Sequence, residues 1–158
     1  MTAPNFCMLL RKHIANGRII SVTQPGLERI VRIEVEHLDE MGDLRRKFIV
    51  IELMGKHSNI IFCDENNVIL DSIKHISAQV SSVREVLPGR DYFIPHSGEK
   101  KNPLTITETE FKELLHSTPQ NLSKALYMDL TGLSPVVAAE ICHLASLDGD
   151  ISDRKSVV

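Results

Sequence analysis

Apolar and polar residues alternate along residues 28–37, where the sequence reads ERIVRIEVEH. Such alternation predicts a β-strand with one buried face. The odd positions from Val31 to Val35 are apolar, so we assign them to the buried face, and this register turns Arg29 inward and Glu28 to the opposite side. The acid and the base therefore cannot neutralise each other across the strand, and each needs its own partner.

Further apolar runs predict four more strands, at residues 18–24, 44–55, 58–64 and 67–73. Turn residues separate these runs. We place Phe48 and Val50 on the inner face of the second of them, together with Glu52 or its neighbours. The sequence therefore predicts a meander of about five antiparallel strands.

Helical periodicity occurs towards both ends of the chain. Residues 5–17 predict a short helix that Asn5 can cap, that Asn16-Gly17 ends and against which the meander packs. From residue 107 onward three helical segments follow. Thr107 and Glu110 can form a capping box for the first, and Ser134 can cap the last.

These patterns give an α+β fold class, which we expect to be a partial antiparallel β-sandwich followed by a helical segment. Residues 1–106 form the truncated β-rich part with one N-terminal helix, and residues 107–150 form a helix-hairpin-helix-like part. The final DRKSVV is also what a common sequencing-adapter string encodes, so we interpret residues 151–158 as a disordered, non-native tail. The open first edge of the meander suggests that the chain is a fragment.

Composition excludes several classes of protein. The chain has 158 residues, of which 42% are hydrophobic and 25% charged, as in ordinary globular proteins. No apolar run approaches the roughly 20 residues of a membrane helix. The three cysteines are far apart, which favours reduced thiols in a cytoplasmic protein over a disulfide framework or a zinc site. We expect no metal and no cofactor.

Charge is unevenly distributed, although the net charge is only −3. Residues 1–27 contain Arg11, Lys12 and Arg18 and no acidic residue. A local basic surface can bind a polyanion even when the whole chain is slightly acidic.

The string MGKHSNIIF places several polar side chains in one loop. Gly55 permits a tight bend, and Lys56, His57, Ser58 and Asn59 follow it. Such a loop can hold a phosphate or a ribose. The alternative, which composition alone favours, is a polar loop whose Asn bonds to its own backbone. No set of nucleophile, base and orienting group accompanies these residues, so we expect no enzyme activity.

An inward-facing Arg29 needs a carboxylate or a ligand. It can pair with Glu52 on the neighbouring strand, or it can contact nucleic acid from the rim of the sheet; the residues alone leave both open. The other residues that we take as candidate RNA or phosphate contacts are Arg11, Lys12, His13, Lys56, His57, Ser58, Asn59, Lys74 and His75.

Six strings, taken in order and at their spacing, resemble one family over residues 3–150. They are PNFCMLLRKHI, QPGLERIV, IELMGKHSNIIF, DSIKHIS, VLPGRDY and LTGLSPVVAAEI. The family is the NFACT-N domain of the RqcH proteins, long labelled fibronectin-binding protein A and related to the eukaryotic NEMF-type proteins. The resemblance implies a β-rich part similar to that of formamidopyrimidine-DNA glycosylases, then a helix-hairpin-helix part. Longer relatives begin several dozen residues earlier and continue into a coiled coil and an RNA-binding module.

The resemblance also implies a function. These proteins bind the large ribosomal subunit obstructed by peptidyl-tRNA and recruit alanyl-tRNA for C-terminal alanine tailing of the stalled chain. Glu28-Arg29 falls on the family's Asp-Arg pair, which engages tRNA, with Glu in place of Asp. The alternatives are a surface adhesin that binds fibronectin and a DNA-repair enzyme. The latter is disfavoured because the chain offers no catalytic acid–base or nucleophile set.

Overall fold

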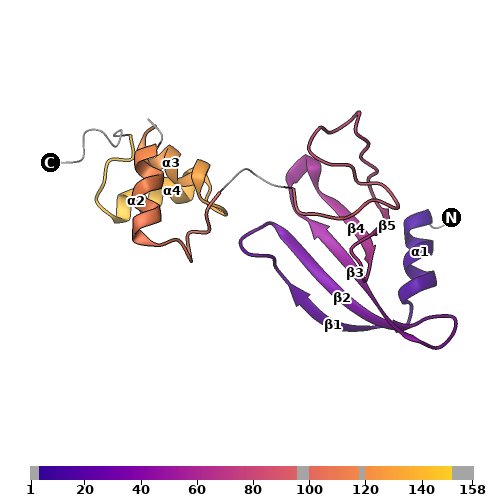
Figure 1. The fold of residues 1–158 in the computed structure, drawn as a ribbon. Coiled ribbons are helices and arrows are strands. Elements are labelled where there is room, and N and C mark those ends of the chain that lie inside the picture. The colour runs from indigo at the N-terminus through magenta and orange to yellow at the C-terminus, as the bar shows by residue number, and fades with distance from the viewer. Residues whose placement is uncertain (1–3, 96–99, 118–119, 151–158) are drawn as a thin grey trace. The chain divides into compact units, whose positions relative to one another are not determined.

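The computed structural model describes residues 4–95, 100–117 and 120–150. The chain divides into two compact units (Figure 1). The sheet unit comprises Met1–Pro25 and Arg29–Pro95, and the helical unit comprises Gly26–Glu28 and His96–Val158.

Two of the domain boundaries expected from the sequence concern residues 100–106 and residues 151–158. Residues 100–106, which we had placed with the β-rich part, lie in the helical unit. The tail expected at residues 151–158 lies outside the described residues.

A five-stranded antiparallel sheet forms the centre of the sheet unit, in the order β1-β2-β3-β4-β5. The strands are β1 (Arg18–Thr23), β2 (Ile30–Leu38), β3 (Leu44–Glu52), β4 (Asn59–Asp64) and β5 (Ile69–Ser72). Each strand pairs with the next along the chain, so the predicted meander and the α+β class are confirmed. The described residues contain no second sheet, so they do not show the sandwich that we expected.

Both faces of the sheet are covered. On one face, Ile30, Val50 and Ile61 pack with residues of the segment that follows β5, such as Val86. The other face carries α1 (Asn5–Ile14), which contacts β2 and β5. Apolar residues are consequently needed on both sides of the strands, which explains the continuous apolar run in β4.

The buried face of β2 was only partly predicted. Val35, 4% exposed, is buried as predicted, and Val31 and Ile33 on the same face are half-buried, but Ile30 on the opposite face is only 1% exposed and lies in the core. Arg29 is exposed and lies in a bend before the strand, so the prediction of an inward-facing arginine is wrong. The error has a physical cause: because the sheet is covered on both sides, alternation did not single out one buried face.

The N-terminal helix is present and ends at Ile14, before the predicted stop at Asn16-Gly17, but its predicted cap is wrong. Asn5 is the first residue of α1, Pro4 occupies the cap position, and no side chain caps the helix. The Pro4 carbonyl instead accepts the Met8 N–H at 3.1 Å, so the backbone alone begins the first turn.

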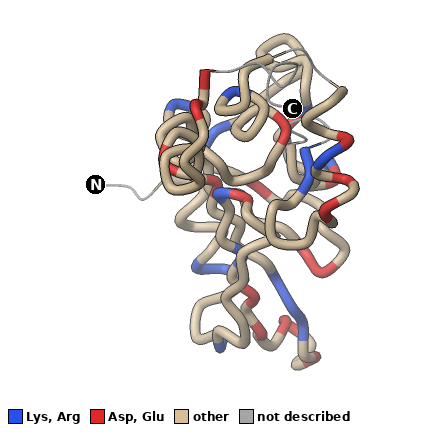
Figure 2. The backbone as a smooth tube through the Cα atoms, turned by 90° about the vertical axis from the view of Figure 1, so that its left-hand side faces the viewer, with Lys and Arg blue, Asp and Glu red and all other residues tan. Residues whose placement is uncertain are grey.

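Exposed charges are largely matched by opposite charges on neighbouring strands. Arg18 on β1 pairs with Glu36 on β2 at 2.8 Å, and Arg46 on β3 pairs with Glu34 on β2 at 3.0 Å. Figure 2 shows Lys and Arg segments interspersed with Asp and Glu segments along the chain. Such exposed pairs contribute little, about 0–1 kcal/mol each, but they offset the positive charge of Arg18 and Arg46.

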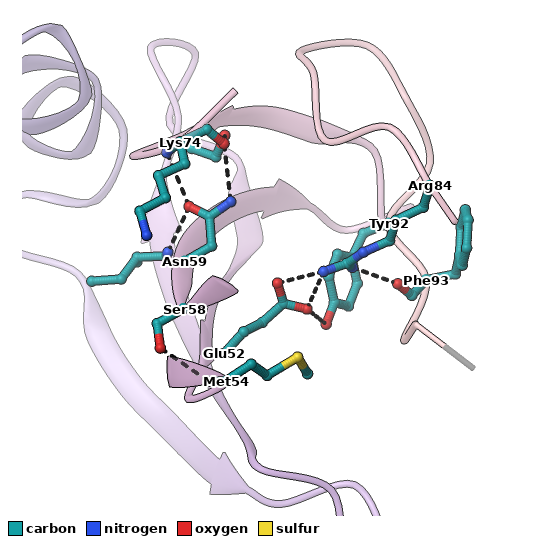
Figure 3. A network of polar contacts seen from close by, with 10 residues as sticks. Glu52, Met54, Ser58, Asn59, Lys74, Arg84, Tyr92 and Phe93 are labelled. Carbon is teal, nitrogen blue, oxygen red and sulfur yellow. Dashed lines mark hydrogen bonds and ion pairs between the residues drawn. The ribbon is translucent and has the colours of Figure 1, made fainter. Parts of the chain in front are cut away.

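A buried carboxylate ties the segment after β5 to the sheet (Figure 3). Glu52, at the end of β3, is 1% exposed, and Arg84 Nη2 donates to both of its oxygens. The Tyr92 hydroxyl donates to the same carboxylate at 3.1 Å, and Arg84 Nη1 donates to the Phe93 carbonyl at 2.7 Å. Burial and the nearby Glu52 charge raise the pKa of Tyr92, so its hydroxyl stays protonated and can donate. Glu52 therefore pairs with Arg84, so of the two alternatives left open for Arg29 the structure does not support the pair with Glu52.

The helical unit contains α2 (Glu108–Ser117), α3 (Leu122–Asp129) and α4 (Pro135–Leu144). The predicted capping box is present, because Glu110 N–H donates to Thr107 Oγ1 at 3.3 Å and Thr107 N–H donates to Glu110 Oε2 at 2.9 Å. The hydrogen bonds that the Thr107 N–H and hydroxyl donate to the Glu110 carboxylate lower its pKa. Ser134 Oγ accepts the Val137 N–H at 3.2 Å, which confirms the predicted cap of α4.

The bend between α3 and α4 requires glycine. Gly132 has φ +80°, and a Cβ at this position would approach Leu27 Cβ to 2.9 Å. Leu27 thereby occupies the space that a side chain at position 132 would need. Its packing there explains why a three-residue segment from before β2 belongs to this unit.

We expect Glu52→Ala to lower the free energy of unfolding by about 3–5 kcal/mol, because it leaves the Arg84 guanidinium buried without a counter-ion. Urea unfolding measures the loss. Glu65→Ala, which removes a half-exposed pair with Arg45, is the control and should cost about 0–1 kcal/mol. The double substitution Glu52→Leu with Arg84→Met should recover part of the loss, and equal costs for Glu52→Ala and the control would contradict this account.

Candidate nucleic-acid interface

Several of the candidate residues lie at one end of the sheet. Ile30 pairs with Glu52 and Glu52 pairs with Asn59, so the start of β2, the end of β3 and the start of β4 are adjacent. Ile61 pairs with Ser72, which brings the end of β5 to the same place. We call this the η1 end, after the short helix η1 (Gly55–His57) that connects β3 to β4.

Arg29 reaches the η1 end through its backbone. Its carbonyl accepts the Leu53 N–H at 2.8 Å, which extends the pairing of β2 and β3 by one step beyond the strands. Its side chain is exposed, whereas Glu28 is half-buried. The division between the two compact units falls between these two residues. Arg29 is therefore positioned by main-chain atoms, and its guanidinium plays no part in the sheet core.

Asn59 and Ser58 bond to the protein's own backbone (Figure 3). Asn59 is 4% exposed; its Nδ2 donates to the Lys74 carbonyl at 2.9 Å, and its Oδ1 accepts the N–H groups of Lys74 and Ile60. Ser58 Oγ accepts the Met54 N–H at 3.0 Å. For these two residues the structure supports the alternative of a polar loop that bonds to its own backbone. The polar side-chain atoms of Ser58 and Asn59 already form these hydrogen bonds.

Four basic side chains remain at the surface of the η1 end. We call Lys56, His57, Lys74 and His75, all exposed, the basic cluster. Lys74 Nζ donates to the Lys56 carbonyl at 3.2 Å, and His75 Nε2 lies 2.6 Å from an oxygen of Asp71. The Asn59 amide holds the two segments of the cluster together, so residues that the sequence placed in separate motifs share one surface.

The remaining candidates lie at the opposite end of the sheet. Lys12 and His13, in the last turn of α1, line a cavity of about 600 Å³ together with Lys47 at the start of β3. The distance along β2 between the two ends is roughly 25 Å, from the rise per residue of a strand. Arg11, in the same turn of α1, belongs with this second group. The candidates therefore form two separate groups and cannot contact the same nucleotide.

The charge of this cavity does not favour an anion. Its lining has more carboxylates than permanent cations: Asp39, Glu40, Asp64 and Glu65 against Lys12, Arg45 and Lys47. Arg45 is itself paired with Asp39 at 3.1 Å. The η1 end is therefore the better candidate for a phosphate-binding surface.

Catalytic and metal chemistry find little support in the described residues. None of their His, Cys, Asp and Glu side chains form a group that could hold a metal ion. Burial raises the pKa of Cys63 to about 12, so its thiol is not a nucleophile near neutral pH. No helix among the described residues has both the length and the apolar character that crossing a bilayer requires.

Comparisons with known proteins agree with this α+β architecture. The family model of the NFACT N-terminal and middle domains matches residues 1–156. The chain is 39% identical over 156 residues to the protein named Rqc2 homolog RqcH from Bacillus subtilis, covering 98% of this chain and 27% of that protein.

Two solved structures are also similar. The N-terminal domain of the fibronectin-binding protein PavA from Streptococcus pneumoniae has a TM-score of 0.75 at 36% identity, covering 92% of this chain and 57% of that one. The fibrinogen binding protein from Staphylococcus aureus has a TM-score of 0.80 at 32% identity, covering 96% of this chain and 55% of that one.

An antiparallel meander followed by a capped helical hairpin, with exposed cations at one end of the sheet, defines a class of α+β modules with a candidate polyanion surface. The chain belongs to the NFACT N-terminal domain family. It spans about a quarter of the length of the curated relative from Bacillus subtilis.

We expect His13→Gln to make stability less dependent on pH. Burial, followed by the charges of Lys47 and Lys12, lowers the pKa of His13 below its ordinary 6.5, so the unfolded chain binds this proton more readily than the folded chain does. The contribution of His13 is therefore complete above pH 6.5 and is lost as the pH falls through the folded-state pKa. Urea unfolding at about pH 7, 6 and 5 should show a shallower decline in the variant. His57→Gln, at an exposed position, should keep the original decline; an unchanged decline in His13→Gln would contradict the assignment.

Proposed function

We propose that this chain is an RNA-binding module that acts in ribosome-associated quality control and contacts tRNA through the η1 end of its sheet. The observation that carries the proposal is that the exposed Arg29 side chain and the basic cluster belong to the same end of the sheet. Family membership supports it, since the matched relative from Bacillus subtilis carries the name Rqc2 homolog RqcH.

Arg29 and Glu28 would have different tasks on the RNA. The guanidinium of Arg29 can bind a phosphate in bidentate fashion or stack on a base. The carboxylate of Glu28 accepts hydrogen bonds, as from a ribose hydroxyl or a base amino group. Glu28 stands where the family pattern has Asp and reaches one methylene further, so it would contact a slightly more distant group.

The wider role that we propose follows the family. The module would bind alanyl-tRNA on a large ribosomal subunit obstructed by peptidyl-tRNA, and so support alanine tailing of the stalled chain. Its contribution would be binding and positioning rather than catalysis, because the η1 end offers cations and no activated nucleophile. The Lys and Arg side chains would supply the salt-dependent part of the affinity.

A second candidate function is binding of a host matrix protein. It is favoured by the similarity to the fibronectin-binding protein PavA from Streptococcus pneumoniae and to the fibrinogen binding protein from Staphylococcus aureus. What the purified chain retains distinguishes the two proposals: tRNA and large subunits for the first, fibronectin for the second.

We expect Arg29→Ala to weaken the binding of alanine tRNA about ten- to a hundredfold, the cost of losing about 1.5–3 kcal/mol of charge-assisted hydrogen bonding. Fluorescence anisotropy with labelled tRNA measures the change. Arg18→Ala is the matched control, because Arg18 is also an exposed arginine, with 77% of its side chain accessible, and begins β1 at the opposite end of the sheet. Glu28→Asp should be tolerated.

The same pair can be tested for function in a chimera, in which this chain replaces the matched region of Bacillus subtilis RqcH. Arg29→Ala should abolish alanine tailing of a stalled reporter while the protein still sediments with large subunits. A normal tailing signal would overturn the assignment of Arg29. A melting temperature lowered by many degrees would instead show that Arg29 supports the fold.

We expect the double substitution Lys56→Ala with Lys74→Ala to reduce the salt dependence of tRNA binding. The slope of log K against log salt concentration should fall by about 0.7–0.9 for each phosphate contact that is lost. Lys112→Ala, which removes an exposed pair with Glu108 on α2, serves as the control. An unchanged slope would remove the basic cluster from the proposed interface.

A further inference from the structure

His75 is an exposed side chain that the structure nevertheless holds in one orientation. Its Nε2 lies 2.6 Å from Asp71 Oδ1, although 54% of the histidine side chain is accessible. Only 18% of the Asp71 side chain is accessible, and Asp71 Oδ1 also accepts the Ser72 N–H at 2.8 Å. The carboxylate is therefore fixed to β5, and it sets the direction of the imidazole before any ligand arrives.

The backbone on both sides of His75 is fixed as well. On one side, the Lys74 N–H and carbonyl are both bonded to the Asn59 side chain (Figure 3). On the other side, Ile76 and Val86 exchange two backbone hydrogen bonds, at 3.0 and 2.7 Å. His75 therefore stands on a rigid length of main chain, although it lies outside the five strands.

The stability of the fold does not explain this support. An exposed ion pair contributes little to stability, and His75 belongs to neither of the apolar clusters that the described residues form. Binding does explain it, because a polar group that is already oriented loses little conformational entropy when a ligand arrives.

One nitrogen of the ring is left for a ligand. An ionised carboxylate can only accept a hydrogen bond, so Nε2 carries the hydrogen of the bond to Asp71. Nδ1 has no hydrogen-bond partner among residues 4–95, 100–117 and 120–150. This nitrogen accepts a hydrogen bond in neutral imidazole and donates one in imidazolium. A hydroxyl group suits both states, because it can donate and accept.

The residues beside His75 indicate the source of such a hydroxyl. Lys74 precedes it directly, and Lys74 Nζ donates to the Lys56 carbonyl at 3.2 Å, so two lysines belong to the same surface. Lysine side chains bind the phosphates of nucleic acids. In an RNA helix, 2′-hydroxyls line the wide, shallow minor groove between the two phosphate backbones. A lysine and a histidine that follow each other can therefore contact a phosphate and a ribose close to it.

We propose that His75 forms a hydrogen bond through Nδ1 with a ribose 2′-hydroxyl, so that the η1 end selects RNA over DNA. Asp71 is the positioning residue of this contact, since it holds the ring without touching the RNA. The inference rests on the proposed function and deepens it, because phosphate contacts alone are available in DNA as well. The 2′-hydroxyl is the group by which a protein distinguishes RNA from DNA at a given site.

The test compares two labelled hairpins of the alanine tRNA acceptor stem by fluorescence anisotropy. One is unmodified RNA, and in the other fluorine replaces each 2′-hydroxyl, which keeps the phosphates and the A-form helix. The wild-type chain should prefer the unmodified hairpin. His75→Ala should reduce this preference about three- to tenfold, the effect of one hydrogen bond, by weakening the binding of the unmodified hairpin only. His75→Phe, which keeps a ring, should have the same effect.

Variants of Asp71 test the positioning. Asp71→Asn keeps an acceptor for Nε2 and should keep the preference for the hydroxyl. Asp71→Ala releases the ring and should reduce the preference as His75→Ala does. His57→Ala is the matched control, because His57 is another exposed histidine of the basic cluster, and it should leave the ratio of the two affinities unchanged. Thermal melting shows whether each variant is folded.

Three outcomes would overturn the proposal. Equal weakening of both hairpins in His75→Ala would identify a contact with phosphate, and an unchanged preference would show that His75 makes no contact with the hydroxyl. Loss of the folded state in both His75 variants would show a structural role. In each case the proposed function stands if tRNA binding still depends on Arg29. If the wild-type chain binds neither hairpin, the proposed function fails and this inference fails with it.

Discussion

The sheet unit depends on one buried carboxylate. Glu52 stands at the end of the central strand β3, shielded from water, and a charge in such a place persists only if it is paired and fully hydrogen-bonded. Arg84 and Tyr92 meet that requirement, and both come from the long irregular segment after β5. A segment with few regular hydrogen bonds is thereby fixed over one face of the sheet. The position of Phe93 depends on this attachment.

Local sequence signals predicted the elements of the fold well. Alternation, turn residues and caps are properties of neighbours in the chain, so the five strands and the capping box of Thr107 could be read without knowledge of the tertiary structure. The buried face of β2 could not be predicted in this way. Which side of a strand is buried depends on what covers it, and here α1 covers one face and residues around Val86 cover the other.

The partner of Glu52 could not be predicted from local sequence patterns either. The sequence offered Arg29, a base on the adjacent strand, as the nearest candidate, whereas the structure uses Arg84, which is 32 residues away along the chain. No local pattern encodes that pairing. The buried Nε of Arg32, which has no hydrogen-bond partner in the described part of the chain, was missed for a related reason, since the groups that surround it are brought together only by the fold.

The candidate site residues were chosen from the sequence without knowledge of how the fold arranges them. The polar loop after Gly55 and the later Lys74-His75 were recognised as separate strings, and only tertiary structure shows that Asn59 joins them. The sequence also could not separate the polar atoms that face a ligand from those used by the backbone. Residues at the end of α1 had been grouped with the loop by charge alone, although a whole strand length separates them.

The manner in which Arg29 is held has a consequence for how such a domain can vary. Its carbonyl takes part in the pairing with Leu53, and any residue type supplies a carbonyl, whereas its side chain contributes nothing to the core. The demands of folding and of recognition therefore fall on different atoms of the same residue. Natural variants at this position could change what the surface recognises while the protein accumulates in the cell at its usual level, so that only an assay of activity would reveal them.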